Sequence, residues 1–142
     1  VVATTGNPAA HIVLRGGRGG PNFGPEHVAD AAAQAERAGI PTRIVVDASH
    51  ANSNKDHVRQ AEVAREIAAE LASAPALAGV MLESFLIAGR QDLSDATRDS
   101  LTYGQSVTDA CLGWDDTVDV LAELAAASRA RRERVLSPAS AR

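Results

Sequence analysis

Four side chains with chemically useful groups stand at the ends of short apolar runs in this sequence. They are Arg15, His50, Glu83 and Asp109, and the runs are HIVLRGG, RIVVDASH, GVMLES and SVTDAC. Together, His50, Glu83 and Asp109 offer one imidazole nitrogen and two carboxylates, a donor set that suits Mn²⁺, Fe²⁺, Co²⁺ or Zn²⁺. The sequence therefore predicts a catalytic metal site made of these three residues.

Each of these residues has a plainer alternative when it is considered alone. His50 could cap the following helix, and Glu83 and Asp109 could be acidic groups at helix starts. There is no local metal motif such as H-E-x-x-H or C-x-x-C, so only the shared position at strand ends connects the three. Cys111 is a further candidate ligand, with a small buried apolar residue as the alternative.

Two basic residues could bind an anion beside these ligands. Arg15 precedes two glycines, whose free backbone amides would complete a clamp for a phosphate or carboxylate. Lys55, the sole lysine, follows the His50 turn and could reach an anionic substrate. The alternatives are a solvated arginine on a mobile loop and an exposed lysine at a helix start. Neither a Walker A loop nor G-x-G-x-x-G is present, which argues against a nucleotide site.

The elements that would position these residues alternate along the chain. Apolar runs predict strands at 11–14, 43–48, 78–82 and, more weakly, 105–110. Helices are expected at 25–39, 57–72 and 115–134, a loop at 89–104 and a disordered tail at 137–142. Strands that are apolar on both faces indicate a parallel sheet covered by helices.

The spacing of the four strand ends favours one particular α/β architecture. Successive ends lie about 35, 33 and 26 residues apart, close to the ~31 expected when ~250 residues supply eight strand–helix units of a barrel. Four units do not close such a barrel, so a small open α/β sheet and half of a TIM-type barrel both remain open. The absence of a starting Met before Val1 favours the half-barrel.

Composition narrows the class of protein further. The chain has 142 residues, a net charge of −4, 3% aromatic residues and one cysteine. The low aromatic content and negative charge argue against nucleic-acid binding, and no apolar run approaches the ~20 residues of a membrane helix. The lone cysteine excludes an internal disulfide and fits a cytoplasmic location.

Several long strings then identify a family resemblance. GNPAAHIVLRGG, PNF, VDASHANSNK, GVMLES and YGQSVTDACLGWDDT occur in this order and strongly resemble the C-terminal half of type I 3-deoxy-D-arabino-heptulosonate 7-phosphate (DAHP) synthase. The resemblance implies that residues 1–136 are part of a β/α barrel. It also implies a transferase of the shikimate pathway, which condenses phosphoenolpyruvate with erythrose 4-phosphate and releases phosphate.

The resemblance also assigns roles to individual residues. It implies that His50, Glu83 and Asp109 bind the metal, with Mn²⁺ as the first expectation, and that Arg15 contacts phosphoenolpyruvate. The family's fourth ligand is a cysteine in the N-terminal half of the barrel, to which Cys111 is not equivalent. We therefore expect the N-terminal half to be a required partner. We also expect the full-length protein to be a homo-oligomer and this chain to be inactive in isolation. Another phosphoenolpyruvate-condensing sugar-acid synthase and a non-catalytic binding or assembly half-barrel are the alternatives.

Overall fold

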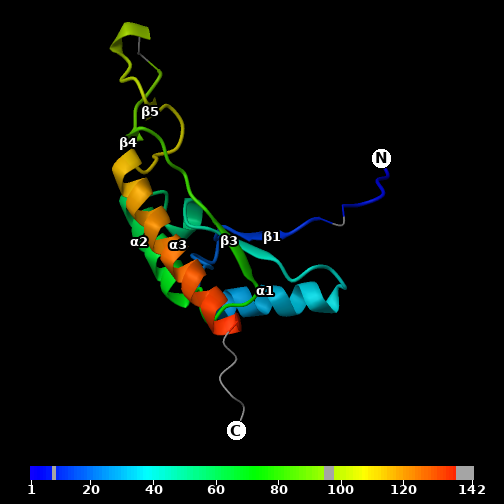
Figure 1. Cartoon of the computed structure of the whole chain (residues 1–142). Coiled ribbons are helices and arrows are strands. Elements are labelled where there is room, and N and C mark those ends of the chain that lie inside the picture. The colour runs from blue at the N-terminus through cyan, green and yellow to red at the C-terminus, as the bar shows by residue number, and fades with distance from the viewer. Residues whose placement is uncertain (8, 95–97, 137–142) are drawn as a thin grey trace.

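Strands and helices alternate through most of the chain (Figure 1). The computed structural model describes residues 1–7, 9–94 and 98–136. The strands are β1 (Ile12–Leu14), β2 (Ile44–Asp47), β3 (Leu77–Met81), β4 (Ile87–Arg90) and β5 (Gln105–Ser106). The helices are α1 (Pro25–Arg37), α2 (His57–Glu70) and α3 (Trp114–Leu136), with short 3₁₀ turns at His50–Asn52 and Arg98–Ser100. The tail expected at 137–142 lies outside the described residues.

The first three strands form a parallel sheet in the order β1-β2-β3. Strands that follow one another along the chain are therefore neighbours, and α1 and α2 make the connections between them. In a parallel sheet all strands end at the same edge, so the residues after β2 and β3 lie close together. The predicted α/β class is confirmed.

Helices cover only one face of this sheet. Buried strand residues on that face, such as Ile44, Val46 and Leu77, join buried residues of α1 and α2 in one apolar core. On the opposite face Val13 and Met81 are 37% and 43% exposed. Among the described residues, the helices expected over the sheet therefore cover one face, and the apolar side chains of the second face have no helix over them.

The strand predicted at 105–110 is present only in part, and it does not join the main sheet. β5 contains only Gln105–Ser106, and it pairs with β4 in a separate two-stranded sheet that projects beyond the main one (Figure 1). The residues from 107 to 110 are polar in part, and an isolated parallel bridge joins Leu112 to Ser84 instead. The first two residues of the loop expected at 89–104 belong to β4 instead, which ends at Arg90.

Local signals explain where the helices begin and end. α2 begins after Asp56, whose carboxylate accepts hydrogen bonds from the backbone amides of Val58 (2.8 Å) and Arg59 (3.3 Å). α1 ends just before Gly39, which has the positive φ of 67° typical of a helix C-terminus.

α2 and α3 pack side by side (Figure 1). No helix in the described part of the chain is long and apolar enough to span a membrane.

Candidate metal centre

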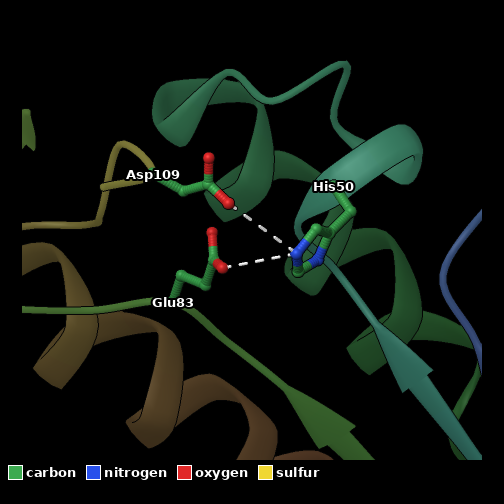
Figure 2. A group of neighbouring side chains, drawn as sticks. All are labelled: His50, Glu83 and Asp109. Atoms are coloured by element: carbon green, nitrogen blue, oxygen red, sulfur yellow. Dashed lines mark ion pairs between the residues drawn. The ribbon is translucent and has the colours of Figure 1, made fainter.

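The structure brings His50, Glu83 and Asp109 together although they are remote in sequence (Figure 2). One donor atom from each lies within 4.8 Å of the others. The Nε2 atom of His50 is 3.5 Å from Oε1 of Glu83 and 3.9 Å from Oδ2 of Asp109. This is the one group of at least three such donors among the described residues. Its mixed nitrogen and oxygen donors suit a divalent cation of intermediate hardness.

Two different arrangements of the backbone deliver these side chains. His50 lies three residues beyond the end of β2 and Glu83 two residues beyond the end of β3, so the parallel sheet places them at one edge. Asp109 is positioned by the parallel bridge between Leu112 and Ser84, which follows β5 in the chain. In this bridge the Leu112 amide donates to the Glu83 carbonyl (2.9 Å), and the Phe85 amide donates to the Leu112 carbonyl (2.9 Å). The carboxylate of Asp109 therefore depends on a loop, not on a fourth strand of the sheet.

The plainer roles considered for these residues do not fit the structure. Asp56, not His50, caps α2. The chain continues from Glu83 into β4, not into a helix, and the acidic residues in the first turn of α3 are Asp115 and Asp116. None of the three side chains is therefore needed as a helix cap.

The turn after β2 holds His50 and Lys55 in strained backbone conformations. His50, Asn54 and Lys55 have φ values of 52°, 54° and 61°, in the left-handed region that residues other than glycine rarely adopt. The Lys55 amide donates to the His50 carbonyl (2.7 Å), which closes this turn. Lys55 lines the same pocket as His50, Glu83 and Asp109. Such strain is common at functional sites, where the surrounding structure must sustain it.

Asp47 is a residue of this site that was not predicted from the sequence. It is 1% exposed, and its carboxylate accepts hydrogen bonds from the amide and hydroxyl of Ser49 (2.9 and 2.5 Å). Its Oδ2 lies 2.8 Å from Nδ1 of His50. A carboxylate in this place holds the proton on Nδ1 and leaves the lone pair of Nε2 directed at Glu83 and Asp109, as in carboxylate–histidine–metal arrangements. The available signal was the acid three residues before the histidine.

Replacing Asp47 by asparagine is expected to weaken Mn²⁺ binding about 10–100-fold. The amide NH₂ would donate to Nδ1 and favour the tautomer that carries its proton on Nε2, the atom needed as a metal ligand. Calorimetric titration with Mn²⁺ measures the effect. Ser49→Ala keeps the Asp47 carboxylate but removes a hydroxyl that lies 2.6 Å from the same Nδ1, so it should lose some affinity, though less than Asp47→Asn. Equal affinities for Asp47→Asn and the unsubstituted protein would contradict the assignment.

Glu83 has an unusual electrostatic setting. Burial raises the pKa of its carboxyl above the ordinary value, and the nearby imidazole of His50 opposes this rise. The negative charges of Asp109 and Asp47 raise the pKa further, whereas Arg15 lowers it. A bound cation would relieve the crowding of negative charge.

This raised pKa predicts a characteristic pH dependence. Because folding raises the pKa of Glu83, its contribution to stability is fully present below the unfolded-state pKa and is lost as the pH rises through the folded-state pKa. Without metal, Glu83→Gln should therefore gain stability relative to the unsubstituted protein as the pH rises through this range. Urea unfolding at a series of pH values measures the difference, and parallel stability curves for the two proteins would refute the prediction.

Arg15 lies at the end of β1, and a set of asparagines holds its loop against the His50 turn. The Gly16 amide donates to Oδ1 of Asn22 (2.6 Å), and the Asn22 amide donates to Oδ1 of Asn52 (2.7 Å). Asn52 is buried and donates to the carbonyls of Leu14 (3.2 Å) and Asp47 (2.7 Å). The guanidinium of Arg15 is exposed, and its charge acts on Glu83. The structure thus brings Arg15 to the same edge of the sheet as the imidazole of His50 and the carboxylates of Glu83 and Asp109.

Cys111 does not join the group of donors. Its thiol lies 3.5 Å from the backbone carbonyl of Asp109, and burial raises its pKa, which disfavours the thiolate needed for metal binding. Its backbone pairs with Gly89 in an isolated antiparallel bridge. The residue therefore has a structural place beside the site.

Comparisons with known proteins agree on one family. The profile of the DAHP synthetase I family matches residues 1–122. The chain is 51% identical over 138 residues to the phospho-2-dehydro-3-deoxyheptonate aldolase of Corynebacterium glutamicum, and 43% identical over 133 residues to the Phe-sensitive enzyme of that name from Escherichia coli K12. Each alignment covers 93% of this chain and 37% of the relative.

A solved structure gives the same result. The phospho-2-dehydro-3-deoxyheptonate aldolase of Francisella tularensis SCHU S4 superposes with a TM-score of 0.84 at 45% identity, over 92% of this chain and 37% of that one. The chain thus spans about 37% of the length of these relatives.

The fold and the site together define an α/β protein with candidate metal ligands at the carboxyl edge of a parallel sheet. The family profile covers most of this chain, including all three candidate ligands. This chain belongs to the DAHP synthetase I family.

Proposed function

We propose that this chain forms the C-terminal part of a β/α barrel that an N-terminal segment completes. The order β1-β2-β3 supports this, because neighbours in a barrel follow one another along the chain. The uncovered face with Val13 and Met81 is the face that would point into the barrel, where other strands would bury it. We refer to this chain together with such a segment as the completed barrel.

The completed barrel is proposed to condense phosphoenolpyruvate with erythrose 4-phosphate. C3 of phosphoenolpyruvate forms a bond to the aldehyde carbon, water adds at C2, and inorganic phosphate leaves to give DAHP. The observation that carries this proposal is the convergence of His50 Nε2 with the carboxylates of Glu83 and Asp109, beside Arg15 and Lys55.

The residues of this chain would perform two tasks. His50, Glu83 and Asp109 would hold the cation, for which Mn²⁺ is our first choice. When bound, a divalent cation supplies Lewis-acid stabilisation of the negative charge on the aldehyde oxygen. Arg15 and Lys55 would bind anionic groups of the substrates and fix their approach, which contributes orientation.

The test is an assay of phosphate release and DAHP formation with Mn²⁺. A fusion of the N-terminal part of the C. glutamicum relative to Val1 provides the completed barrel, and the 142-residue chain alone provides the comparison. We expect turnover by the fusion and none by the chain alone. No turnover by the folded fusion, or equal turnover with other aldose phosphates in place of erythrose 4-phosphate, would argue against the proposal.

Two further expectations accompany this function. The single free thiol, Cys111, supports a cytoplasmic location. A homo-oligomer of the completed barrel remains a prediction that light scattering can test.

A further inference from the structure

Gln60 is an internal polar residue that none of the proposed catalytic tasks uses. It lies on α2 and is 1% exposed, although glutamine is usually found at the surface. Burying a side-chain amide is costly unless both of its ends are hydrogen-bonded. The contacts of this amide therefore indicate why it is retained at this position.

Both ends of the Gln60 amide bind the backbone of one candidate ligand, Glu83. Its Oε1 accepts a hydrogen bond from the Glu83 amide (2.6 Å), and its Nε2 donates to the Glu83 carbonyl (3.1 Å). Gln60 thus contacts Glu83 as a neighbouring strand would, at a point beyond the last residue of β3, Met81. The other contact of the Glu83 carbonyl comes from the Leu112 amide (2.9 Å).

These bonds connect the elements that carry the three ligands. α2 begins seven residues after His50, and its second turn reaches Glu83 through Gln60. The Leu112 bond ties Glu83 to the segment that carries Asp109. Gln60 also lines the pocket that these three ligands share. Removing the amide would free the peptide of Glu83 on the side of α2, although the carboxylate group itself would still be present in the chain.

We propose that Gln60 is a positioning residue, which holds the main chain of Glu83 so that its carboxylate meets His50 and Asp109 around one cation. The inference rests on the proposed function, since it assumes that these three residues bind a metal. Its alternative is a purely structural role, in which Gln60 contributes to the stability of the α2 interface alone.

The two roles can be separated by measuring Mn²⁺ affinity together with stability. Gln60→Met has a similar length but makes neither hydrogen bond, and Gln60→Glu keeps an acceptor for the Glu83 amide but loses the donor. Val63→Ala is the matched control, because Val63 lies on the same helix, is 0% exposed and has no polar group. Electron paramagnetic resonance of free Mn²⁺ gives the affinity of the completed barrel, and thermal unfolding without metal gives the stability.

We expect Gln60→Met to bind Mn²⁺ about 10–100-fold more weakly, as is usual when a group supporting a metal ligand is lost. The Mn²⁺ affinity of Gln60→Glu should lie between those of Gln60→Met and the unsubstituted protein. If Gln60→Met does not fold, Gln60→Glu is the variant that tests the inference. Val63→Ala should lose stability but keep its affinity within about twofold. Folded Gln60 variants with unchanged affinity, or an equal loss of affinity in Val63→Ala, would overturn the inference.

A further variant distinguishes this failure from failure of the proposed function. His50→Ala should remove Mn²⁺ binding whether or not Gln60 matters. If His50→Ala weakens binding and the Gln60 variants do not, only the positioning role is wrong. If His50→Ala and the unsubstituted protein bind Mn²⁺ equally, the metal site is wrong and the inference fails with it.

Discussion

Substitution of His50 by alanine is expected to lower kcat/KM of the completed barrel by about 10³-fold or more. His50 supplies the only nitrogen donor of the candidate site, and its Nε2 is the atom that faces both carboxylates. A metal ion contributes several kcal/mol of transition-state stabilisation, and each ~1.4 kcal/mol corresponds to a tenfold change in rate. Initial rates of phosphate release at saturating Mn²⁺ measure the loss.

His27→Ala is the control for this experiment. His27 is an exposed residue of α1 that pairs with Glu26 and does not belong to the candidate ligands. It should retain nearly full activity. If His50→Ala retained more than a tenth of the rate while remaining folded, the role given to the imidazole would be wrong.

Substitution of Gly16 by alanine is expected to give the largest loss of stability among the changes considered. Gly16 has a φ of 73°, and an added Cβ would lie 2.7 Å from Cβ and 2.9 Å from the carbonyl carbon of Ala51. A non-glycine residue in this conformation costs about 1–3 kcal/mol, and overpacking costs about 1–3 kcal/mol more. Since Ala51 belongs to the His50 turn, the strain should also raise the KM for phosphoenolpyruvate by moving Arg15.

Gly19→Ala offers a matched comparison within the same loop. A Cβ at Gly19 meets no atom within 4 Å, and its φ does not lie in the left-handed region. Urea unfolding should therefore show a lower free energy for Gly16→Ala and a nearly unchanged one for Gly19→Ala. Equal free energies of unfolding for the two variants would show that the close approach to Ala51 is not rigid.

Local sequence signals were sufficient for the elements with strong periodicity. The apolar run before His50 is a strand, and the helix from Pro25 ends where Gly39 provides a positive φ. The helix predicted at 115–134 is α3, which has acidic residues in its first turn and an arginine in its last. Each of these features depends on residues close together in the chain, which a single sequence reveals.

Features that depend on distant residues could not be predicted in the same way. Asp109 was expected at the end of a strand, but it is placed by pairing between Leu112 and Ser84, two residues with no distinctive local pattern. Asp47 and Gln60 resemble ordinary strand and helix residues in the sequence. Their contacts with His50 and Glu83 exist only once β2, α2 and β3 have assembled.

The most direct test of the central claim is anomalous diffraction at the manganese absorption edge from crystals of the completed barrel grown with Mn²⁺. The proposed site predicts one strong peak among Nε2 of His50 and the carboxylate oxygens of Glu83 and Asp109, and its loss in His50→Ala crystals. A peak elsewhere, or none at this position while the three side chains remain ordered, would contradict the assignment of these residues as metal ligands.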